Sequence, residues 1–435
     1  MCSQPPLYSR WLTLVDDRPG DIATIDLSVN EELTFADLAA RVEETPIAIA
    51  PISAEACGVA FIVNVLRAWR DGVALVPLEN STGFDSKLLK GIPPETAHVK
   101  QSSGTTGTPR LILFNESQLA ADADQIVSSM ELLRYDWNIG VISLAHSYGF
   151  SNLVLPLLLH GIPLILGEGP LPASVKTALA HTDGTAIIPG VPAMWDAWQK
   201  TGILKNAAIG LAISAGAPLT LELEKNIMNS SGIKIHNFYG SSECGGIAYD
   251  YSNSLRFDSN VVGKPINGVT LGFSQDTRLI VRSPAVAMGY WPDRNLEELG
   301  NASFQTSDLA ESDAISGQVS LLGRAGEMIN VAGRKLSPGE VETAISRVSG
   351  IQCCVVFGVP STDPHRVEDI VACIAMRQDI TERDLRAELN KILPPWQLPR
   401  ILWTCNDLAV NSRGKISRSH WRQRFLEEKT TKRSR

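Results

Sequence analysis

The chain has 435 residues, of which 44% are hydrophobic and 20% are charged, and its formal net charge is −8 at pH 7. This length predicts two or three domains of a globular protein, and the acidic balance disfavours nucleic acid as a general partner. The seven cysteines include no CxxC pair, which favours reduced thiols in the cytoplasm over a disulfide scaffold or a zinc site.

The N-terminal residues carry neither the basic region nor the apolar run of a signal peptide, so we expect a cytoplasmic protein. Residues 137–167 contain no Asp, Glu, Lys or Arg, and their number is sufficient to span a bilayer. The same segment contains Asn152, Pro156 and His160, which favour a buried helix over 151–160 followed by a short strand over 164–166. We therefore expect no membrane span.

Short apolar runs alternate with helical patterns along most of the chain, which predicts an α/β architecture. The expected strands are 73–77, 111–114, 140–144, 186–189, 210–214 and 234–238. The expected helices between them are 117–133, 174–180, 193–201 and 220–229. Residues 269–281 have the pattern of two paired strands.

A smaller α+β module is predicted after Gly323, which gives domains over 1–322 and 323–435. Ser337 is a suitable N-cap and Pro338 a suitable first residue for its first helix. Strands over 353–359 and 370–375 and a helix over 382–392 follow. From residue 324 onward the chain has 19 Lys and Arg against 13 Asp and Glu, so this part is basic and the remainder acidic. The charged tail 427–435 is expected to be disordered.

A loop rich in glycines and hydroxyls follows residue 101 and ends in Arg110. Its predicted ligand-binding members are Ser102, Ser103, Gly104, Thr105, Thr106 and Gly107. Glycines let backbone N–H groups turn toward one point, hydroxyls add donors, and Arg110 adds a permanent positive charge. The segment predicts a polyphosphate loop, although such a composition alone is also typical of a surface turn. It is not a Walker A loop, because Gly-Lys-Ser/Thr is missing.

This loop resembles the phosphate loop of the acyl-adenylate-forming superfamily, which includes acyl- and aryl-CoA synthetases, peptide-synthetase adenylation domains and luciferases. The family pattern Ser/Thr-Ser/Gly-Gly-Ser/Thr-Thr-Gly-x-Pro-Lys is matched except at its end, where Arg110 replaces Lys. The resemblance covers nearly the whole chain. It implies a large N-terminal domain of layered α/β subdomains and a small, mobile α+β C-terminal domain. The connection between Leu78 and the loop is shorter than is usual in the family.

The segment 239–243 reads Tyr-Gly-Ser-Ser-Glu and follows an expected strand. A carboxylate beside hydroxyls at a strand end is suited to hold Mg²⁺ against phosphates. The segment is similar to the family's Tyr-Gly-x-Thr-Glu, which implies that Tyr239, with Gly240, packs on adenine, Ser242 meets the α-phosphate and Glu243 binds magnesium. Cys244 has no nearby base in the sequence and is interpreted as a packed residue.

Other nucleotide contacts are implied by the resemblance alone. The backbone of Gly216, Ala217 and Pro218 would line the adenine pocket. Asp308 and Arg324 would bind the ribose hydroxyls, since a carboxylate accepts two hydrogen bonds from a diol. Residues 323–342 form the longest match, and they would contain a hinge at Gly326 and a glycine, Gly333, beside the pantetheine tunnel.

Two residues are implied in the chemistry itself. Lys415 lies in the C-terminal Gly-Lys-Ile-x-Arg loop and would bridge the substrate carboxylate and the α-phosphate. His146 lies in a segment similar to the family's Pro-x-x-His-x-x-Gly and would border the substrate carboxylate, although a core histidine is the alternative. No Asp is present over 137–167 to pair with an amine, so an uncharged acyl or aryl acid is favoured over an amino acid.

The function implied is the ATP- and Mg²⁺-dependent activation of a carboxylic acid to acyl-AMP, followed by transfer to a thiol. CoA is the first choice of thiol, and a separate acyl carrier protein or an amine are alternatives. A non-catalytic nucleotide sensor is a further alternative, which the complete loop around Lys415 disfavours. The oligomeric state is expected to be a monomer or a homodimer.

Overall fold

The computed structural model describes residues 6–79, 84–101, 110–292, 298–363, 366–377, 380–405, 407–408 and 416–433. The chain separates into two compact units. One consists of Met1–Ser274, Leu279–Thr306 and Ser312–Ser320, and the other of Gln275–Arg278, Ser307–Glu311 and Leu321–Arg435. The predicted boundary near Gly323 lies beside Leu321, but two short earlier segments also belong to the second unit.

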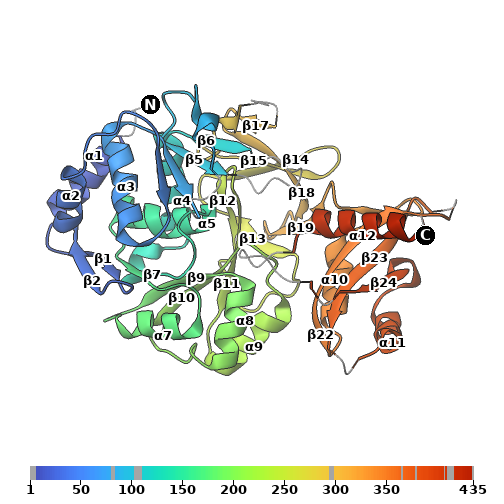
Figure 1. Cartoon of the computed structure of the whole chain (residues 1–435). Helices are drawn as coiled ribbons and strands as arrows, with labels where there is room; N and C mark the ends of the chain where they lie inside the picture. The colour runs from blue at the N-terminus through green and yellow to red at the C-terminus, as the bar shows by residue number, and fades with distance from the viewer. Residues whose placement is uncertain are drawn as a thin grey trace. The chain divides into compact units, whose positions relative to one another are not determined.

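A large sheet runs through the first unit, and its central strands are parallel (Figure 1). The parallel strands, in spatial order, are β11 (Ile235–Ser241), β10 (Ile209–Ser214), β9 (Ala186–Gly190), β7 (Trp137–Gly140), β8 (Leu164–Leu166) and β1 (Ile22–Asp26). The sheet continues past both ends of this group through β2 (Glu31–Thr34), β12 (Gly245–Tyr249), β13 (Val261–Pro265), β14 (Thr270–Phe273), β15 (Arg278–Arg282), β17 (Leu299–Gly300), β18 (Ser303–Ser312) and β19 (Val319–Arg324).

Helices cover the parallel strands because both faces of the apolar sheet must be shielded from water. Trp195 and Trp198 are fully buried and pack with Ile188 and Ile235 of the strands. They belong to one helical layer, α7 (Pro172–Ala180), α8 (Pro192–Thr201) and α9 (Leu221–Ser231), which lies together on one side of the sheet in Figure 1. The remaining helices of this unit are α1 (Leu7–Asp17), α2 (Phe35–Glu43), α3 (Gly58–Asp71), α4 (Glu116–Ser129), α5 (Ser147–Gly149) and α6 (Leu155–His160).

Local sequence sets where these helices begin. Thr34 and Asn115 form capping boxes at the starts of α2 and α4, where each side chain accepts the N3 amide and the N3 side chain accepts the cap amide. The uncharged segment beginning at residue 147 is helical through α5, a π-helical turn over Phe150–Val154, and α6. Within the described ranges, no helix is both long and apolar enough to cross a membrane.

A second sheet in the same unit positions the loop that follows residue 101. Its order is β16 (Gly289–Trp291), β6 (Leu111–Phe114), β5 (His98–Gln101), β4 (Leu75–Leu78) and β3 (Ile52–Glu55). Strands β3, β4 and β5 are parallel, and β5 pairs antiparallel with β6. The predicted phosphate loop therefore connects two neighbouring antiparallel strands.

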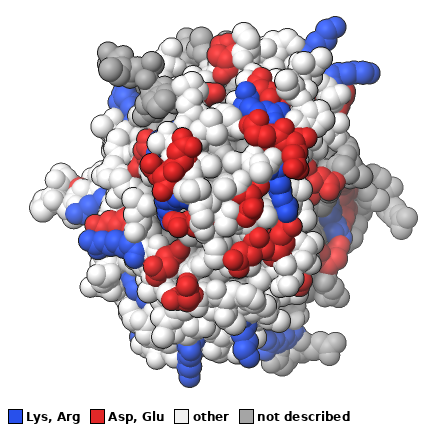
Figure 2. Space-filling model, turned by 90° about the vertical axis from the view of Figure 1, so that its left-hand side faces the viewer, with Lys and Arg blue, Asp and Glu red and all other residues white. Residues whose placement is uncertain are grey.

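The face of the first unit that looks left in Figure 1 is turned toward the viewer in Figure 2. Acidic side chains are spread across this face, and the basic ones are scattered. A nucleic-acid surface shows the opposite pattern, with Lys and Arg clustered on one face. The acidic balance of residues 1–323 is thus visible as a distributed surface charge.

The second unit is an α+β module built on the sheet β22 (Ile351–Pro360), β23 (Glu368–Met376) and β24 (Ile401–Thr404), with a hairpin of β20 (Ile329–Val331) and β21 (Arg334–Leu336). Helices α10 (Pro338–Ser346) and α11 (Glu382–Ile392) share one apolar core with the sheet. The alternate residues of β22 and β23, which face the other side of the sheet, form a second apolar core with helix α12 (Arg418–Arg433). The mixed α/β class, with a large N-terminal and a small C-terminal part, is confirmed.

Two local predictions are wrong. The strand predicted over 140–144 ends at Gly140, because the chain then folds back so tightly that a Cβ at Gly149 would lie 2.0 Å from the Ser143 carbonyl oxygen. The tail expected to be disordered from residue 427 continues helix α12 to Arg433. Trp421 and Phe425, one helical turn apart, bury the face that anchors it.

Candidate functional site

The carboxyl ends of the central parallel strands bring three predicted segments to one edge of the sheet. Ser214, which ends β10, pairs with Gly190 of β9 on one side and Asn237 of β11 on the other. The Tyr148 hydroxyl donates to the carbonyl oxygen of Ile213 at 3.1 Å, so the segment that follows β7 lies at the same edge. Ligands of parallel α/β sheets bind at such carboxyl ends. The structure thus places the segments at 146, 216 and 239 on the edge where a ligand is expected.

Glu243, the predicted magnesium ligand, is fixed from both its backbone and its side chain. Its amide donates to Ser241 Oγ at 3.2 Å, and its carbonyl oxygen accepts from the Ala287 amide at 2.9 Å. The Tyr290 hydroxyl donates to Glu243 Oε1 at 3.1 Å. Burial, together with the Glu243 charge, raises the pKa of Tyr290 well above its usual value of 10, so the phenol stays a hydrogen-bond donor.

Tyr290 also links Glu243 to the predicted phosphate loop. The Arg110 guanidinium carbon lies 5.1 Å from the centre of the Tyr290 ring, in cation–π range. Arg110 is exposed, and it follows residues 102–107, which lie outside the described residues. Sequence reasoning missed Tyr290. The aromatic pair Tyr290–Trp291 was the one available signal, and only the pairing of β16 against β6 shows its relevance.

Glu243 fits a magnesium ion that is shared with a nucleotide. In the described parts of the chain, no group of three or more His, Cys, Asp or Glu residues is placed to hold a metal. Mg²⁺ commonly takes one or two carboxylates and completes its shell with waters and substrate phosphates. A single half-buried carboxylate therefore suits a Mg²⁺ ion that is shared with ATP, and the ion remains a prediction.

The turn around Glu243 depends on glycine. A Cβ at Gly240 would lie 2.5 Å from the carbonyl oxygen of Gly245, so only glycine permits the close approach of β11 and β12 there. Tyr239 and Ser242 are half-buried beside it. On the neighbouring strand connection, Gly216 adopts a φ of 81°, which favours glycine, and Ala217 is half-buried while Pro218 is exposed.

A buried polar group lies directly behind this turn, and the sequence did not reveal it. Asp122 of α4 accepts from the Gly246 amide at 3.1 Å and from Ser151 Oγ at 2.5 Å. Lys100 of β5 is buried with its ammonium 4.4 Å from the centre of the Phe114 ring, and burial lowers its pKa although the Asp122 charge opposes this. These residues anchor the strand that leads into the loop at 102.

Cys244 is a packed residue, as expected. Its side chain is fully buried, with Sγ 3.3 Å from Ser241 Oγ. Burial raises the pKa of its thiol to about 12. A thiol nucleophile needs a lowered pKa, so Cys244 is not suited to covalent chemistry.

The predicted ribose-binding residues meet in the second unit. Arg324 Nε lies 3.0 Å from Asp308 Oδ1, and the Ala325 amide donates to the Ser307 carbonyl oxygen at 2.8 Å. Gly326, the predicted hinge, has no heavy atom within 4 Å of where its Cβ would be. Gly333 adopts a φ of 86°, and its amide donates to Asn330 Oδ1 at 2.9 Å. Lys415 lies outside the described residues.

His146, predicted to border the substrate acid, is paired with a carboxylate from another segment. Its Nε2 lies 2.8 Å from Oε1 of Glu79, which directly follows β4. Glu79 lies outside residues 137–167, the segment that has no Asp to pair with an amine. An acidic group does stand at this position, although it comes from the second sheet.

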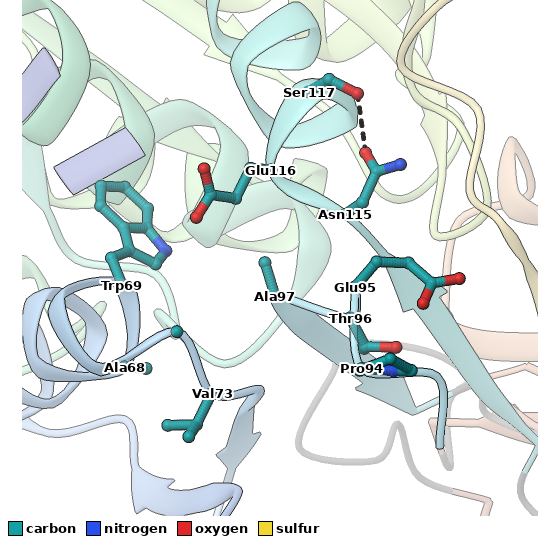
Figure 3. Close-up of a pocket in the computed structure, with 11 residues that line it drawn as sticks. Ala68, Trp69, Val73, Pro94, Glu95, Thr96, Ala97, Asn115, Glu116 and Ser117 are labelled. Atoms are coloured by element: carbon teal, nitrogen blue, oxygen red, sulfur yellow. Dashed lines mark hydrogen bonds between the residues drawn. The ribbon is translucent and has the colours of Figure 1, made fainter. Parts of the chain in front are cut away.

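A surface cavity of about 310 Å³ is lined by residues that the sequence did not single out (Figure 3). It is lined by the end of α3, residues 94–97 before β5, and Asn115, Glu116 and Ser117 at the start of α4. The predicted phosphate loop follows the opposite end of β5. None of the predicted site residues contributes to this cavity.

Comparison with known proteins gives two family matches, one for each part of the chain. The family described as AMP-binding enzyme matches residues 76–291, and the AMP-binding enzyme C-terminal domain matches residues 340–415. Among curated proteins, a feruloyl-CoA synthase from an Amycolatopsis species is 25% identical over 345 residues, which cover 74% of this chain and 69% of that protein.

Solved structures share the fold at lower identity. ATP-bound MatB from Rhodopseudomonas palustris superposes with a TM-score of 0.83 and 19% identity, and the match covers 97% of this chain and 98% of that one. An amide bond synthetase from Marinactinospora thermotolerans gives a TM-score of 0.79 and 20% identity, over 97% of this chain and 100% of that one. One of these proteins is described by its bound ATP and the other as an amide bond synthetase, so the shared fold alone does not identify the acceptor.

Proposed function

We propose, because this chain belongs to the AMP-binding enzyme family, that it activates a carboxylic acid with ATP and transfers the acyl group to CoA. The observation that carries the proposal is Glu243, held by Tyr290 beside Arg110 at the carboxyl end of β11. The feruloyl-CoA synthase and other curated relatives named as CoA ligases support the thiol acceptor.

In the first half-reaction, a carboxylate oxygen attacks the α-phosphorus of ATP, and the bond to the bridging oxygen of pyrophosphate breaks. The products are acyl-AMP and pyrophosphate. Such a reaction needs positioning and charge neutralisation more than covalent help from the protein. Arg110 and the loop at 102–107 would hold the β- and γ-phosphates, and Ser242 would meet the α-phosphate. Mg²⁺, held by Glu243, would neutralise phosphate charge.

The nucleoside would be held by groups from both units. Tyr239 would pack on adenine with the backbone of 216–218, and Asp308 with Arg324 would bind the ribose hydroxyls. Lys415 would bridge the substrate carboxylate and the α-phosphate, where negative charge grows in the transition state. His146 would border the carboxylate of the acid.

In the second half-reaction, the thiol of CoA loses its proton, and its sulfur attacks the acyl carbon. The bond between that carbon and the AMP oxygen breaks, which releases AMP and a thioester. Gly326 would permit a rotation of the C-terminal domain. This rotation would move Lys415 away from the acyl-AMP and bring the pantetheine tunnel near Gly333 toward it. The substrate is proposed to be an uncharged acyl or aryl acid.

The decisive experiment measures pyrophosphate release from ATP and Mg²⁺ with a panel of aliphatic, aryl and amino acids. We expect release that depends on the acid and falls by about 10²–10³-fold in Lys415→Ala. Lys391→Ala is the matched control, because Lys391 is a 67% exposed lysine of the same unit, where it forms an ion pair with Glu388. Mass spectrometry with CoA, an acyl carrier protein or an amine then identifies the acceptor.

ATP binding without pyrophosphate release from any acid would contradict the proposed enzyme and favour a nucleotide sensor. Release that gives an amide but no thioester would keep the adenylation step and reject CoA. An amide product is the second candidate, because the amide bond synthetase shares the fold over its whole length.

A further inference from the structure

A carboxylate from one sheet and a histidine from another meet at the edge where the predicted acid site lies. Glu79 directly follows β4, and Ser143 and His146 lie in the loop after β7. Glu79 Oε1 lies 2.8 Å from His146 Nε2 and accepts from Ser143 Oγ at 2.7 Å. Ser143 Oγ in turn accepts from the Ala145 amide at 3.2 Å. One carboxylate oxygen therefore joins two side chains of the loop.

The backbone of this loop is already fixed without Glu79. A Cβ at Gly149 would lie 2.0 Å from the Ser143 carbonyl oxygen, so glycine alone permits the tight return of the chain. The Phe150 amide donates to the His146 carbonyl oxygen at 2.8 Å, and the Tyr148 hydroxyl holds the carbonyl oxygen of Ile213. What the backbone leaves open is the rotation and the tautomer of the His146 ring.

The pair is too exposed to be explained by stability. The side chains of His146 and Glu79 are 35% and 41% exposed. Ion pairs with such exposure contribute between zero and about 1 kcal/mol to folding. A histidine whose one nitrogen donates to a carboxylate has a defined tautomer, and this is how proteins orient rings that act on a ligand.

We propose that Glu79 is a positioning residue for His146 and, through it, for the carboxylate of the acid substrate. Its acceptance of a hydrogen bond from Nε2 leaves Nδ1 as the ring nitrogen for the substrate. Glu79 thereby fixes the rotation and the tautomer of the ring that faces the substrate. The inference rests on the proposed function, in which His146 borders that carboxylate.

The kinetic test uses the full-length chain with Glu79→Ala, Glu79→Gln and the control Glu31→Ala. Glu31 is 33% exposed and is also ion-paired, with Arg41, but on β2 and α2. Glu79→Ala is expected to lower kcat/KM for the acid by about 10- to 100-fold while KM for ATP stays within about twofold. Glu79→Gln should recover most of this loss, because its amide oxygen still accepts from Nε2–H. The control should match the wild type.

Coupling between the two residues is measured with His146→Ala and the double variant. If Glu79 acts through His146, the double variant should be no worse than His146→Ala alone. Additive losses would overturn the inference, as would an acid kcat/KM in Glu79→Ala within twofold of wild type. Failure of Glu79→Gln to recover activity would overturn positioning by the hydrogen bond.

A readout that needs no activity separates this inference from the proposed function. The ¹⁵N shifts of the His146 ring, assigned with His146→Ala, report which nitrogen carries the proton. We expect the Nε2–H form in the wild type and a tautomer mixture in Glu79→Ala. An unchanged ring spectrum would overturn the inference even in an active enzyme. Absent pyrophosphate release with a changed spectrum would overturn the proposed function alone.

Discussion

The two ends of strand β11 carry charged clusters of opposite character. At its start, Lys234 Nζ lies 2.5 Å from Glu224 Oε1 and 2.7 Å from Asp250 Oδ2. Arg256 Nε lies 2.9 Å from the other oxygen of Glu224, whose side chain is 1% exposed. Every charge in this cluster has an opposite charge in contact, and water is nearly excluded.

At the other end of the same strand, Glu243 is half-buried and receives one side-chain hydrogen bond, from Tyr290. The Arg110 guanidinium carbon lies 5.1 Å from the centre of the Tyr290 ring, and the buried Lys100 ammonium interacts electrostatically with Glu243. The charges of the first cluster form ion pairs that hold segments of the chain together. In the second, Tyr290 orients a carboxylate that forms no ion pair with a described residue, which suits the predicted site for a cation and a polyphosphate.

The largest expected effect comes from breaking the buried cluster. Glu224→Ala leaves Lys234 and Arg256 buried without their shared carboxylate, and such a loss destabilises by about 3–5 kcal/mol. The midpoint of the first unit's urea unfolding should fall accordingly. Glu31→Ala, which breaks an exposed pair with Arg41, should cost about 1 kcal/mol or less. Equal shifts in the two variants would refute the distinction.

Glu243→Gln tests the other end of the strand. The substitution keeps size and folding, and it removes the charge proposed to bind Mg²⁺. Pyrophosphate release should fall by about 10²–10³-fold, with a higher Mg²⁺ concentration needed for half-maximal rate. Glu222→Gln, at an exposed carboxylate of α9, serves as control. A normal Mg²⁺ dependence in Glu243→Gln would exclude Glu243 as the magnesium ligand.

Tyr290→Phe is expected to have a smaller effect, since it removes the hydroxyl that orients Glu243 and keeps the ring under Arg110. The loss of one such hydrogen bond predicts a decrease of about 2- to 10-fold in the rate of pyrophosphate release. Tyr290→Leu also removes the ring and should be worse. A loss in Tyr290→Phe as large as that in Glu243→Gln would mean that the hydroxyl contacts the substrate itself.

The smallest effect is expected at Cys244, the neighbour of Glu243. The burial that raises its thiol pKa to about 12 leaves almost no thiolate at pH 8, whereas Cys57 is exposed. Iodoacetamide should therefore modify Cys57 and spare Cys244 in the folded protein, as measured by peptide mass spectrometry. Rapid labelling of Cys244 without unfolding would show that this end of β11 opens.

Contiguous patterns were the predictable part of this protein. Helix α11 and strand β6 begin and end where the sequence predicts, because their periodicity and flanking residues are local. The segment 239–243 lies at a strand end, as expected, and Asp308 meets Arg324 at 3.0 Å. The roles of these residues in binding ATP stay predictions.

Contacts between distant segments were not predictable. Tyr290 reaches Glu243 across 47 positions, and Glu79 reaches His146 from a different sheet. A lone Tyr or Glu after a strand carries no local signal, since its partner depends on which strands become neighbours. For this reason Glu79 could not be foreseen from residues 137–167, and the choice of an uncharged acid stays a prediction.

The sequence by itself determined the α/β class, the family, and the short motifs whose glycines, hydroxyls and carboxylate follow one another along the chain. The tertiary structure alone decided which charges are neutralised and which remain available, because that depends on burial and on partners far away in sequence. Glu224 and Glu243, at opposite ends of one strand, are the same residue type with opposite surroundings. Packing gives the first a structural role, and the second is predicted to bind a ligand.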